Sequence, residues 1–190
     1  MPAPLGAALA LGTVVALSGA VHLDGFFDGC DAFFASVPVV QRLEILKDPR
    51  HGTFALAGLA VVGSIWFASV TALPPRALPA SLAFAGALAR AAVVPCAFTF
   101  PDARSATRKP AFAPRHAAVP LALDVIVLAM LCRQLSPVAA LLVPAAPAGA
   151  AAILRWCAGR LGGGLVGDAY GFAIVVLEVA ILAALAARRS

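Results

Sequence analysis

Three aspartates stand close together in the stretch VHLDGFFDGCDAFF, residues 21–34, although the whole chain has only nine acidic residues. Asp24, Asp28 and Asp31 follow the spacing i, i+4, i+7, which in a helix places side chains on one face, here within an arc of about 60°. Carboxylates on one stripe repel each other unless a cation neutralises them, and oxygen-only ligands favour Mg²⁺ or Mn²⁺. The spacing predicts a metal-holding helix. The alternative is a solvated acidic cap on a membrane helix.

A basic stretch, RLEILKDPRHGT, follows the aspartates at residues 42–53. Arginine binds phosphate in a bidentate manner and lysine acts as a point charge, so Arg42, Lys47 and Arg50 are candidates to bind a phosphate-linked substrate. A metal beside them would clamp a diphosphate and offset charge on the leaving phosphate. The alternative is ordinary loop charge. Asp48 either adds a fourth metal ligand or pairs with Lys47 or Arg50.

The composition is that of an integral membrane protein. Of the 190 residues, 62% are hydrophobic and 12% charged, and the mean hydropathy is +0.97, whereas soluble domains carry about 25% charged residues. The net charge of +5 therefore indicates membrane orientation rather than nucleic-acid binding. Four scattered cysteines form no CxxC pair and predict neither a disulfide framework nor a zinc site.

Six apolar runs are long enough to suggest transmembrane helices of about 20 residues each. The first is interpreted as a true span rather than a secretory signal, because no Lys or Arg precedes Arg42. Prolines and glycines separate the later runs. We therefore predict an all-α, polytopic bundle in one membrane-embedded domain, residues 1–190. The six runs are residues 4–21, 53–73, 81–100, 117–135, 138–157 and 170–187.

The distribution of basic residues predicts the orientation of this bundle. Nine Lys and Arg residues fall on the side of the connections 22–52, 101–116 and 158–169, and four fall on the other side. The excess places the three connections in the cytoplasm and the N-terminus outside, and we expect them to form a single mouth. The nine are Arg42, Lys47, Arg50, Arg104, Arg108, Lys109, Arg115, Arg155 and Arg160; the four are Arg76, Arg133, Arg188 and Arg189.

A second candidate element lies near the C-terminus, in RLGGGLVGDAYGFAIVVLE, residues 160–178. Glycines let backbone N–H groups approach a phosphate closely, which makes Gly163, Gly164 and Gly167 candidate ligand-binding residues. Asp168 follows them, and we expect it to close the site opposite the aspartate helix, as a metal ligand or as the base that orients an attacking hydroxyl.

Arg90 lies inside a predicted span. An arginine at such a depth must face a polar interior, so Arg90 is a candidate catalytic residue. The alternative is a structural ion pair with Asp124 or Glu178.

The chain resembles the adenosylcobinamide-GDP ribazoletransferase, or cobalamin synthase, family in the stretch HLDGFFDGCDAFF and in RLEILKDPRHGT, which follows it. The family patterns at these places read HLDGxxDxxDG and LEIM-[RK]-D-x-R-x-G-[TS]. The glycine-rich stretch is similar to the family's GGxTGDxxGAxxExxE segment. The resemblance implies a Mg²⁺-dependent enzyme of the bacterial inner membrane, multi-pass, with its active site facing the cytoplasm. It further implies joining of GDP-activated adenosylcobinamide to α-ribazole or its 5′-phosphate, with release of GMP, and it adds His22 to the substrate-binding candidates.

Several positions depart from the family pattern. Val166 replaces a threonine, Val175 a glutamate, and Ala32 the glycine after the third aspartate. The resemblance also implies a further N-terminal segment with another span, so the chain resembles a shortened, divergent member. The sequence leaves open a CDP-alcohol phosphotransferase, a transporter or a non-catalytic subunit, as well as the choice of ribazole substrate, the number of metals and the formation of a homo-oligomer.

Overall fold

The computed structural model describes residues 2–105, 118–132, 135 and 137–187. These residues form eight α-helices and, apart from one isolated β-bridge, no β-structure. The prediction of an all-α fold is therefore confirmed. The helices are α1 (Ala3–Ser18), α2 (Val21–Phe34), α3 (Val39–Ile45), α4 (Thr53–Ala72), α5 (Leu78–Thr99), α6 (Ala118–Cys132), α7 (Pro137–Arg160) and α8 (Gly167–Ala187).

Each predicted apolar run became a helix, and most ends agree within a few residues. Four helices, α4, α5, α7 and α8, are long and apolar enough to cross a membrane, and the pair α1 and α2, bent by 94°, gives up to a fifth crossing. The chain is thus a multi-pass membrane protein. The described part of α6 is shorter than a full span, so the number six stays a prediction.

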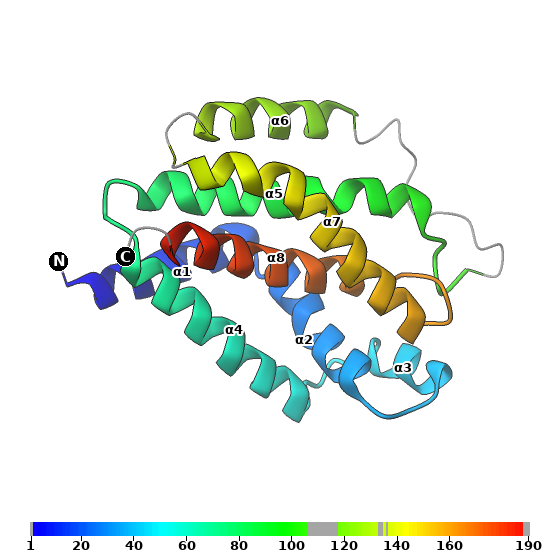
Figure 1. The fold of residues 1–190 in the computed structure, drawn as a ribbon. Coiled ribbons are helices and arrows are strands. Elements are labelled where there is room, and N and C mark those ends of the chain that lie inside the picture. Colours follow the sequence, from blue (N-terminus) through cyan, green and yellow to red (C-terminus); the bar gives the residue numbers. More distant parts are fainter. Residues whose placement is uncertain (1, 106–117, 133–134, 136, 188–190) are drawn as a thin grey trace.

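Helix α8 occupies the centre of the bundle, packed against α2, α4, α5 and α7 (Figure 1). It is apolar on nearly all sides, as expected of a helix surrounded by others. Gly25 of α2 and Gly171 of α8 lie at their crossing, where a Cβ added to Gly25 would come within 3.1 Å of the Asp168 Cα. The paired glycines therefore let the two helices approach at backbone distance.

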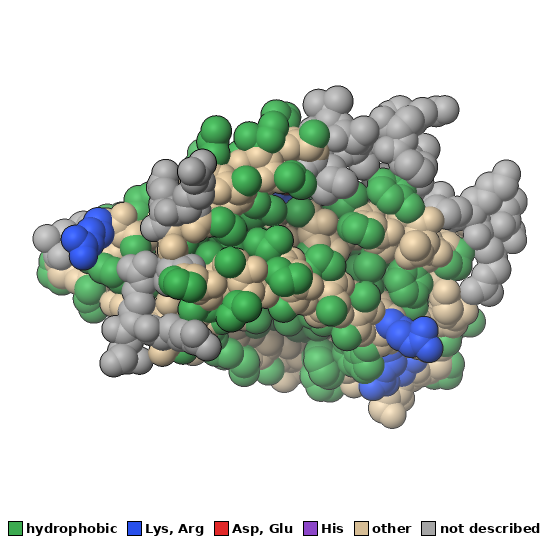
Figure 2. All heavy atoms as spheres, turned by 45° about the horizontal axis from the view of Figure 1, so that its top comes forward, with side chains coloured by type: hydrophobic (Ala, Val, Ile, Leu, Met, Phe, Trp, Pro, Cys, Tyr) green, Lys and Arg blue, Asp and Glu red, His purple; other side chains and the backbone are tan. Residues whose placement is uncertain are grey.

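The outward faces of the bundle are apolar. Large exposed side chains include Leu56, Val61 and Ile65 on α4, and Leu123 and Met130 on α6. Figure 2 shows hydrophobic side chains across the middle of one face, with the exposed Lys and Arg side chains mainly towards its two ends. This pattern matches a belt in contact with lipid tails between two polar zones.

The connections that follow α2, α5 and α7 meet at one end of the bundle, which we call the loop end: residues 35–52, 100–105 and 161–166 (Figure 1). Leu165 makes two backbone hydrogen bonds across this end: its carbonyl oxygen accepts from Ala103 N at 2.9 Å, and its N–H donates to Pro101 O at 2.8 Å. The Arg104 guanidinium donates to Leu46 O at 3.2 Å. The expected single mouth is confirmed for these residues, while 106–116 lie outside the described residues.

Candidate active site

The aspartate stretch is helical throughout, because α2 runs from Val21 to Phe34. Its opposite face is anchored by Phe26 and Phe33, both buried, with ring centroids 5.5 Å from that of Phe172 on α8. This packing fixes the rotation of α2 about its axis. It leaves Asp24 exposed and Asp28 half-buried on the side away from the phenylalanines.

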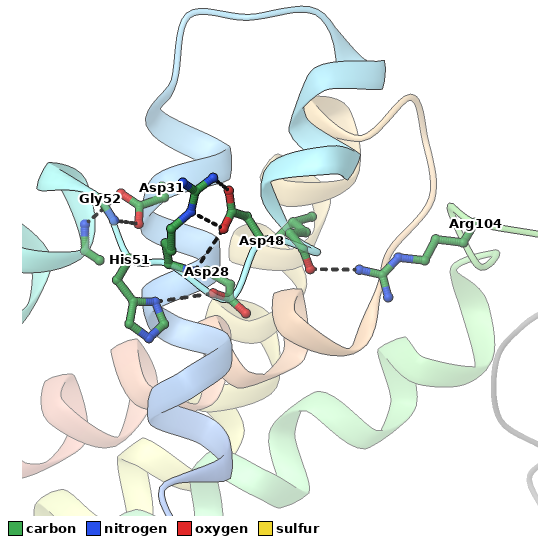
Figure 3. A network of polar contacts seen from close by, with 9 residues as sticks. Asp28, Asp31, Asp48, His51, Gly52 and Arg104 are labelled. Atoms are coloured by element: carbon green, nitrogen blue, oxygen red, sulfur yellow. Dashed lines mark hydrogen bonds and ion pairs between the residues drawn. The ribbon is translucent and has the colours of Figure 1, made fainter.

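Asp31 is held by the backbone at the start of α4. Its carboxylate accepts hydrogen bonds from Gly52 N at 2.5 Å and from Ala55 N at 3.1 Å (Figure 3). The first N–H groups of a helix have no partner within the helix, and the negative charge also suits the positive end of the helix dipole. Asp31 thus joins α2 to α4 and is already engaged by two donors.

Asp28 lies in a field of neighbouring charges. Its carboxylate oxygen is 3.5 Å from His51 Nδ1, on the segment that precedes α4 (Figure 3). Asp24, Asp168 and Asp31 are close enough to repel its negative charge, and His51 is the attractive neighbour. Three acidic neighbours around one half-buried carboxylate create a site that favours a cation.

Asp168 lies in the first turn of α8, beside α2. Its Oδ2 is 3.3 Å from Nη2 of Arg104, and that guanidinium also donates to Leu46 O. The N–H of Arg104 donates to the Asp102 carboxylate at 2.8 Å, which fixes the turn that presents the arginine. The structure therefore brings the glycine-rich element and the aspartate helix together.

A cavity of about 490 Å³ opens between α2, α5 and α8. Its polar lining residues, His22, Asp24, Asp168 and Tyr170, come from α2 and α8. The opposite wall comes from the last turns of α5 and is apolar. The lining residues are Val21, His22, Asp24, Gly25, Val93, Val94, Ala97, Phe98, Gly167, Asp168, Tyr170, Gly171 and Ile174.

Arg90 pairs with Glu178 rather than with Asp124. Its Nη1 is 3.7 Å from Glu178 Oε2 and donates to Gly86 O at 2.7 Å. Both residues line a second, smaller cavity of about 140 Å³, whereas His22 lines this cavity and the larger one. Arg90 therefore lines the smaller cavity and not the larger one, and its predicted catalytic role stays a prediction.

The predicted phosphate-binding cations lie at the loop end. Arg50 Nε and Nη2 donate to the two Asp48 oxygens at 2.9 and 2.8 Å, and this pairing lowers the pKa of Asp48 to about 2. Asp48 therefore pairs with Arg50, one of the two alternatives left open by the sequence. Arg50 and Lys47 remain exposed, while Arg42 donates to backbone carbonyls of Ala35 and Arg160 and so ties the connections together.

The glycines after α7 have distinct structural roles. Gly163 has φ +93°, in the region that favours glycine, and its N–H donates to Ala158 O at 2.7 Å to end α7. A Cβ at Gly164 would stand 2.7 Å from the Ala103 Cα. Gly167 lines the larger cavity. Only Gly167 of the three lies on that cavity wall, and phosphate binding by any of them stays a prediction.

The four predicted metal ligands are not gathered into one closed set. Among the described residues, no three His, Cys, Asp or Glu side chains are placed to hold a metal ion unaided. Mg²⁺ commonly takes one or two carboxylates and completes its shell with water and substrate phosphates. Asp24 and Asp28, four residues apart on α2 and facing Asp168, fit that requirement. Metal binding by Asp24, Asp28, Asp31 and Asp48 stays a prediction.

Sequence reasoning gave little weight to three residues that the structure places at the site. Arg104 binds Asp168, His51 contacts Asp28 and Tyr170 lines the cavity. Arg104 could have been singled out as a cation two positions after Asp102 at the end of a span. His51 and Tyr170 carry no such signal, because their neighbours are distant in sequence.

Comparison with known proteins identifies a family. The family model described as cobalamin-5-phosphate synthase matches residues 1–186. A protein named adenosylcobinamide-GDP ribazoletransferase from Deinococcus radiodurans is 37% identical over 185 residues, which cover 96% of this chain and 65% of that relative. Proteins of the same name from Pseudomonas putida and Pseudomonas paraeruginosa are 35% and 36% identical, over 97% of this chain and 76% of theirs.

The chain thus spans less than two thirds of the Deinococcus protein's length. No solved structure matches.

Proposed function

The chain belongs to the cobalamin-5-phosphate synthase family, and from that membership we propose that it joins GDP-activated adenosylcobinamide to α-ribazole, or its 5′-phosphate, and releases GMP. The observation that carries the proposal is the shared cavity of Asp24 and Asp168. Two motifs that lie far apart in the sequence supply carboxylates to one pocket at the loop end, as a composite active site requires.

The reaction is a displacement at phosphorus. A hydroxyl oxygen of the ribazole forms a new bond to the phosphorus on the corrinoid side of the diphosphate. The bond from that phosphorus to the bridging oxygen breaks, and the bridging oxygen leaves as part of GMP. Asp168 accepts the hydroxyl proton, and the Arg104 guanidinium, 3.3 Å from its carboxylate, holds it in place.

The carboxylates of Asp24, Asp31 and Asp168 repel that of Asp28, and a divalent cation bound among them would offset this repulsion. Asp24 and Asp28 would hold Mg²⁺, which when bound supplies positive charge to the diphosphate and to the departing GMP. Lys47 and Arg50, exposed at the same end of the bundle, add cations that can contact the phosphates from solution. Arg90 and Glu178 line the smaller cavity that His22 also lines.

We also propose that the loop end faces the cytoplasm of a bacterial cell, with the chain in the inner membrane. The excess of basic residues on the connections supports this orientation. The nucleotide-activated corrinoid is a soluble, anionic molecule, so an active site on this side can receive it directly. Association into a homo-oligomer is compatible with the broad apolar faces of α4 and α6.

The test is a GMP-release assay with the full chain in liposomes. GDP-activated adenosylcobinamide and α-ribazole are supplied with Mg²⁺, and GMP and the joined corrinoid are measured together. We expect equal amounts of both products, no turnover in EDTA, and loss of turnover in Asp24→Asn. Asp124→Asn, on α6, is the matched control and should remain active.

Absence of GMP release from well-folded protein, with both substrates and metal present, would refute the proposal.

A separate measurement follows Mn²⁺ binding by electron paramagnetic resonance. Wild-type protein should bind Mn²⁺ in competition with Mg²⁺, and Asp24→Asn with Asp28→Asn should abolish binding. Unchanged Mn²⁺ binding in the double variant would place the metal elsewhere.

A further inference from the structure

The cavity between α2, α5 and α8 has two chemically different walls. Asp24 and Asp168 form a polar side at the first turns of α2 and α8. Val93, Val94, Ala97 and Phe98 form the facing wall from the last turns of α5. These four positions follow the spacing i, i+1, i+4, i+5, which places them on one side of a helix. A ligand with one polar part and one apolar part therefore matches the chemistry of the two walls.

The size and chemistry of the cavity limit which substrate it can receive. Its volume of about 490 Å³ suits a molecule of nucleoside size, whereas a corrin ring with its amide side chains is far larger. The α5 wall has no side-chain hydrogen-bond donor or acceptor. On the side that faces α5, a guanine base would lose hydrogen bonds to water and find no side-chain partner, which is unfavourable.

We propose that this cavity is the subsite for the acceptor nucleoside, with its apolar aromatic base against the α5 wall and its ribose directed towards Asp24 and Asp168. The inference rests on the proposed function and adds to it the location and the recognition of the second substrate. Ala97 and Phe98 then determine which base is accepted: Phe98 offers an aromatic ring for contact, and Ala97 leaves the room that the base occupies.

This placement also brings the reacting hydroxyl of the ribose close to Asp168, the residue that accepts its proton. A ribose beside Asp24 and Asp168 lies where a second ligand, the diphosphate of the corrinoid, can approach from the loop end. Arg104, bound to Asp168, stands at this same end. A 5′-phosphate on the acceptor would project towards that guanidinium, so the pocket can accommodate either form of the nucleoside.

The first experiment makes the cavity smaller at the α5 wall. Ala97→Phe fills the space assigned to the base, and we expect the KM for α-ribazole to rise by about 10–200-fold, the range typical of a steric mismatch in an apolar pocket. The KM for the GDP-activated corrinoid should stay near its wild-type value. Ala60→Phe, the same substitution on the exposed face of α4, is the matched control and should leave both constants unchanged.

A second variant makes the cavity larger at the α5 wall, and it provides a test of the inference if the first variant misfolds. Ala97→Gly should improve the use of a riboside with a bulkier fused aromatic base relative to α-ribazole itself. An unchanged preference for base size in Ala97→Gly, or an unchanged KM for α-ribazole in folded Ala97→Phe, would overturn the inference. So would a rise confined to the KM for the corrinoid.

Binding measured without the second substrate separates this inference from the proposed function. Calorimetry with α-ribazole alone should detect binding to wild-type protein in detergent and its loss in Ala97→Phe. If wild-type protein binds α-ribazole but releases no GMP, the proposed function fails and the subsite stands. If GMP is released but Ala97→Phe binds α-ribazole normally, the subsite fails alone. Occupation by a lipid chain that α-ribazole cannot displace would also overturn it.

Discussion

Asp31 on α2 accepts the backbone N–H of Gly52 at 2.5 Å, and so supplies from another helix the acceptor that the start of α4 lacks locally. Gly52 fits this contact because it has no side chain: a Cβ there would stand 2.8 Å from Asp31 Oδ1, the other carboxylate oxygen. The contact holds the segment with His51 against α2, where the imidazole faces Asp28. The third aspartate of the stripe therefore positions the site even if it binds no metal.

This relationship predicts a loss of stability in Asp31→Ala. The variant leaves two N–H groups at the start of α4 without their acceptor, which costs about 1–3 kcal/mol and lowers the Tm by about 2–4 °C per kcal/mol in a chain of this size. Thermal unfolding in detergent, followed by circular dichroism, measures it. Asp48→Ala is the control, because its carboxylate is exposed and binds only Arg50. An unchanged Tm with complete loss of activity would instead identify Asp31 as a direct site residue.

The α2–α8 crossing predicts that Gly25→Ala impairs activity and stability together. The new Cβ would lie 3.1 Å from the Asp168 Cα and 3.2 Å from its carbonyl oxygen, and backbone cannot yield as a flexible side chain does. We expect a destabilisation of about 1–3 kcal/mol and a displaced Asp168. Gly63→Ala, whose Cβ would meet nothing nearer than 4.0 Å, should be neutral or stabilising. Normal activity in Gly25→Ala would show that activity does not depend on the close approach of α2 and α8.

The predictable part of this fold is the part that depends on local sequence. Apolar runs bounded by Pro and Gly gave the helices from residue 53 onward nearly to their ends, because burial in lipid requires long apolar helices. The spacing of Asp24 and Asp28 likewise predicted their common helix, because periodicity is a property of the chain itself. The same reasoning could not predict that Asp31, unlike Asp24 and Asp28, binds backbone N–H groups at the start of α4.

The remaining contacts depend on how loops fold over one another. The partners of Asp31 lie 21 and 24 residues along the chain, and those of Arg104 are 58 and 64 residues away. No short pattern records such pairings. Arg42 shows the consequence: it was a candidate phosphate ligand by residue type, yet its guanidinium binds two backbone carbonyls. Residue type indicates which side chains can bind phosphate, and only tertiary structure shows which are available.

The Arg90–Glu178 pair predicts coupling between two residues inside the bundle. Either Arg90→Met or Glu178→Gln leaves one polar partner without the other. Each single variant should therefore destabilise the protein more than the double variant does. A double-mutant cycle on thermal unfolding should give a coupling free energy of about 0.5–3 kcal/mol. The exposed pair Asp48 and Arg50 should show little coupling in the same assay. Additive effects at Arg90 and Glu178 would show that the pair, 3.7 Å apart, contributes no interaction energy.

Asp168→Asn is expected to remove most turnover while leaving the bundle folded, because the amide keeps the size of the carboxyl and its oxygen can still accept from Arg104. A general base contributes about 10²–10⁴-fold in rate, so GMP release should fall within that range, with Asp124→Asn unchanged as the control. A titration with Mg²⁺ distinguishes the two roles open to this carboxylate. If Asp168 is a metal ligand, a high Mg²⁺ concentration should recover part of the activity. If it takes the proton from the ribazole hydroxyl, added Mg²⁺ should restore nothing. Turnover near the wild-type rate would mean that α2 carries the chemistry without α8.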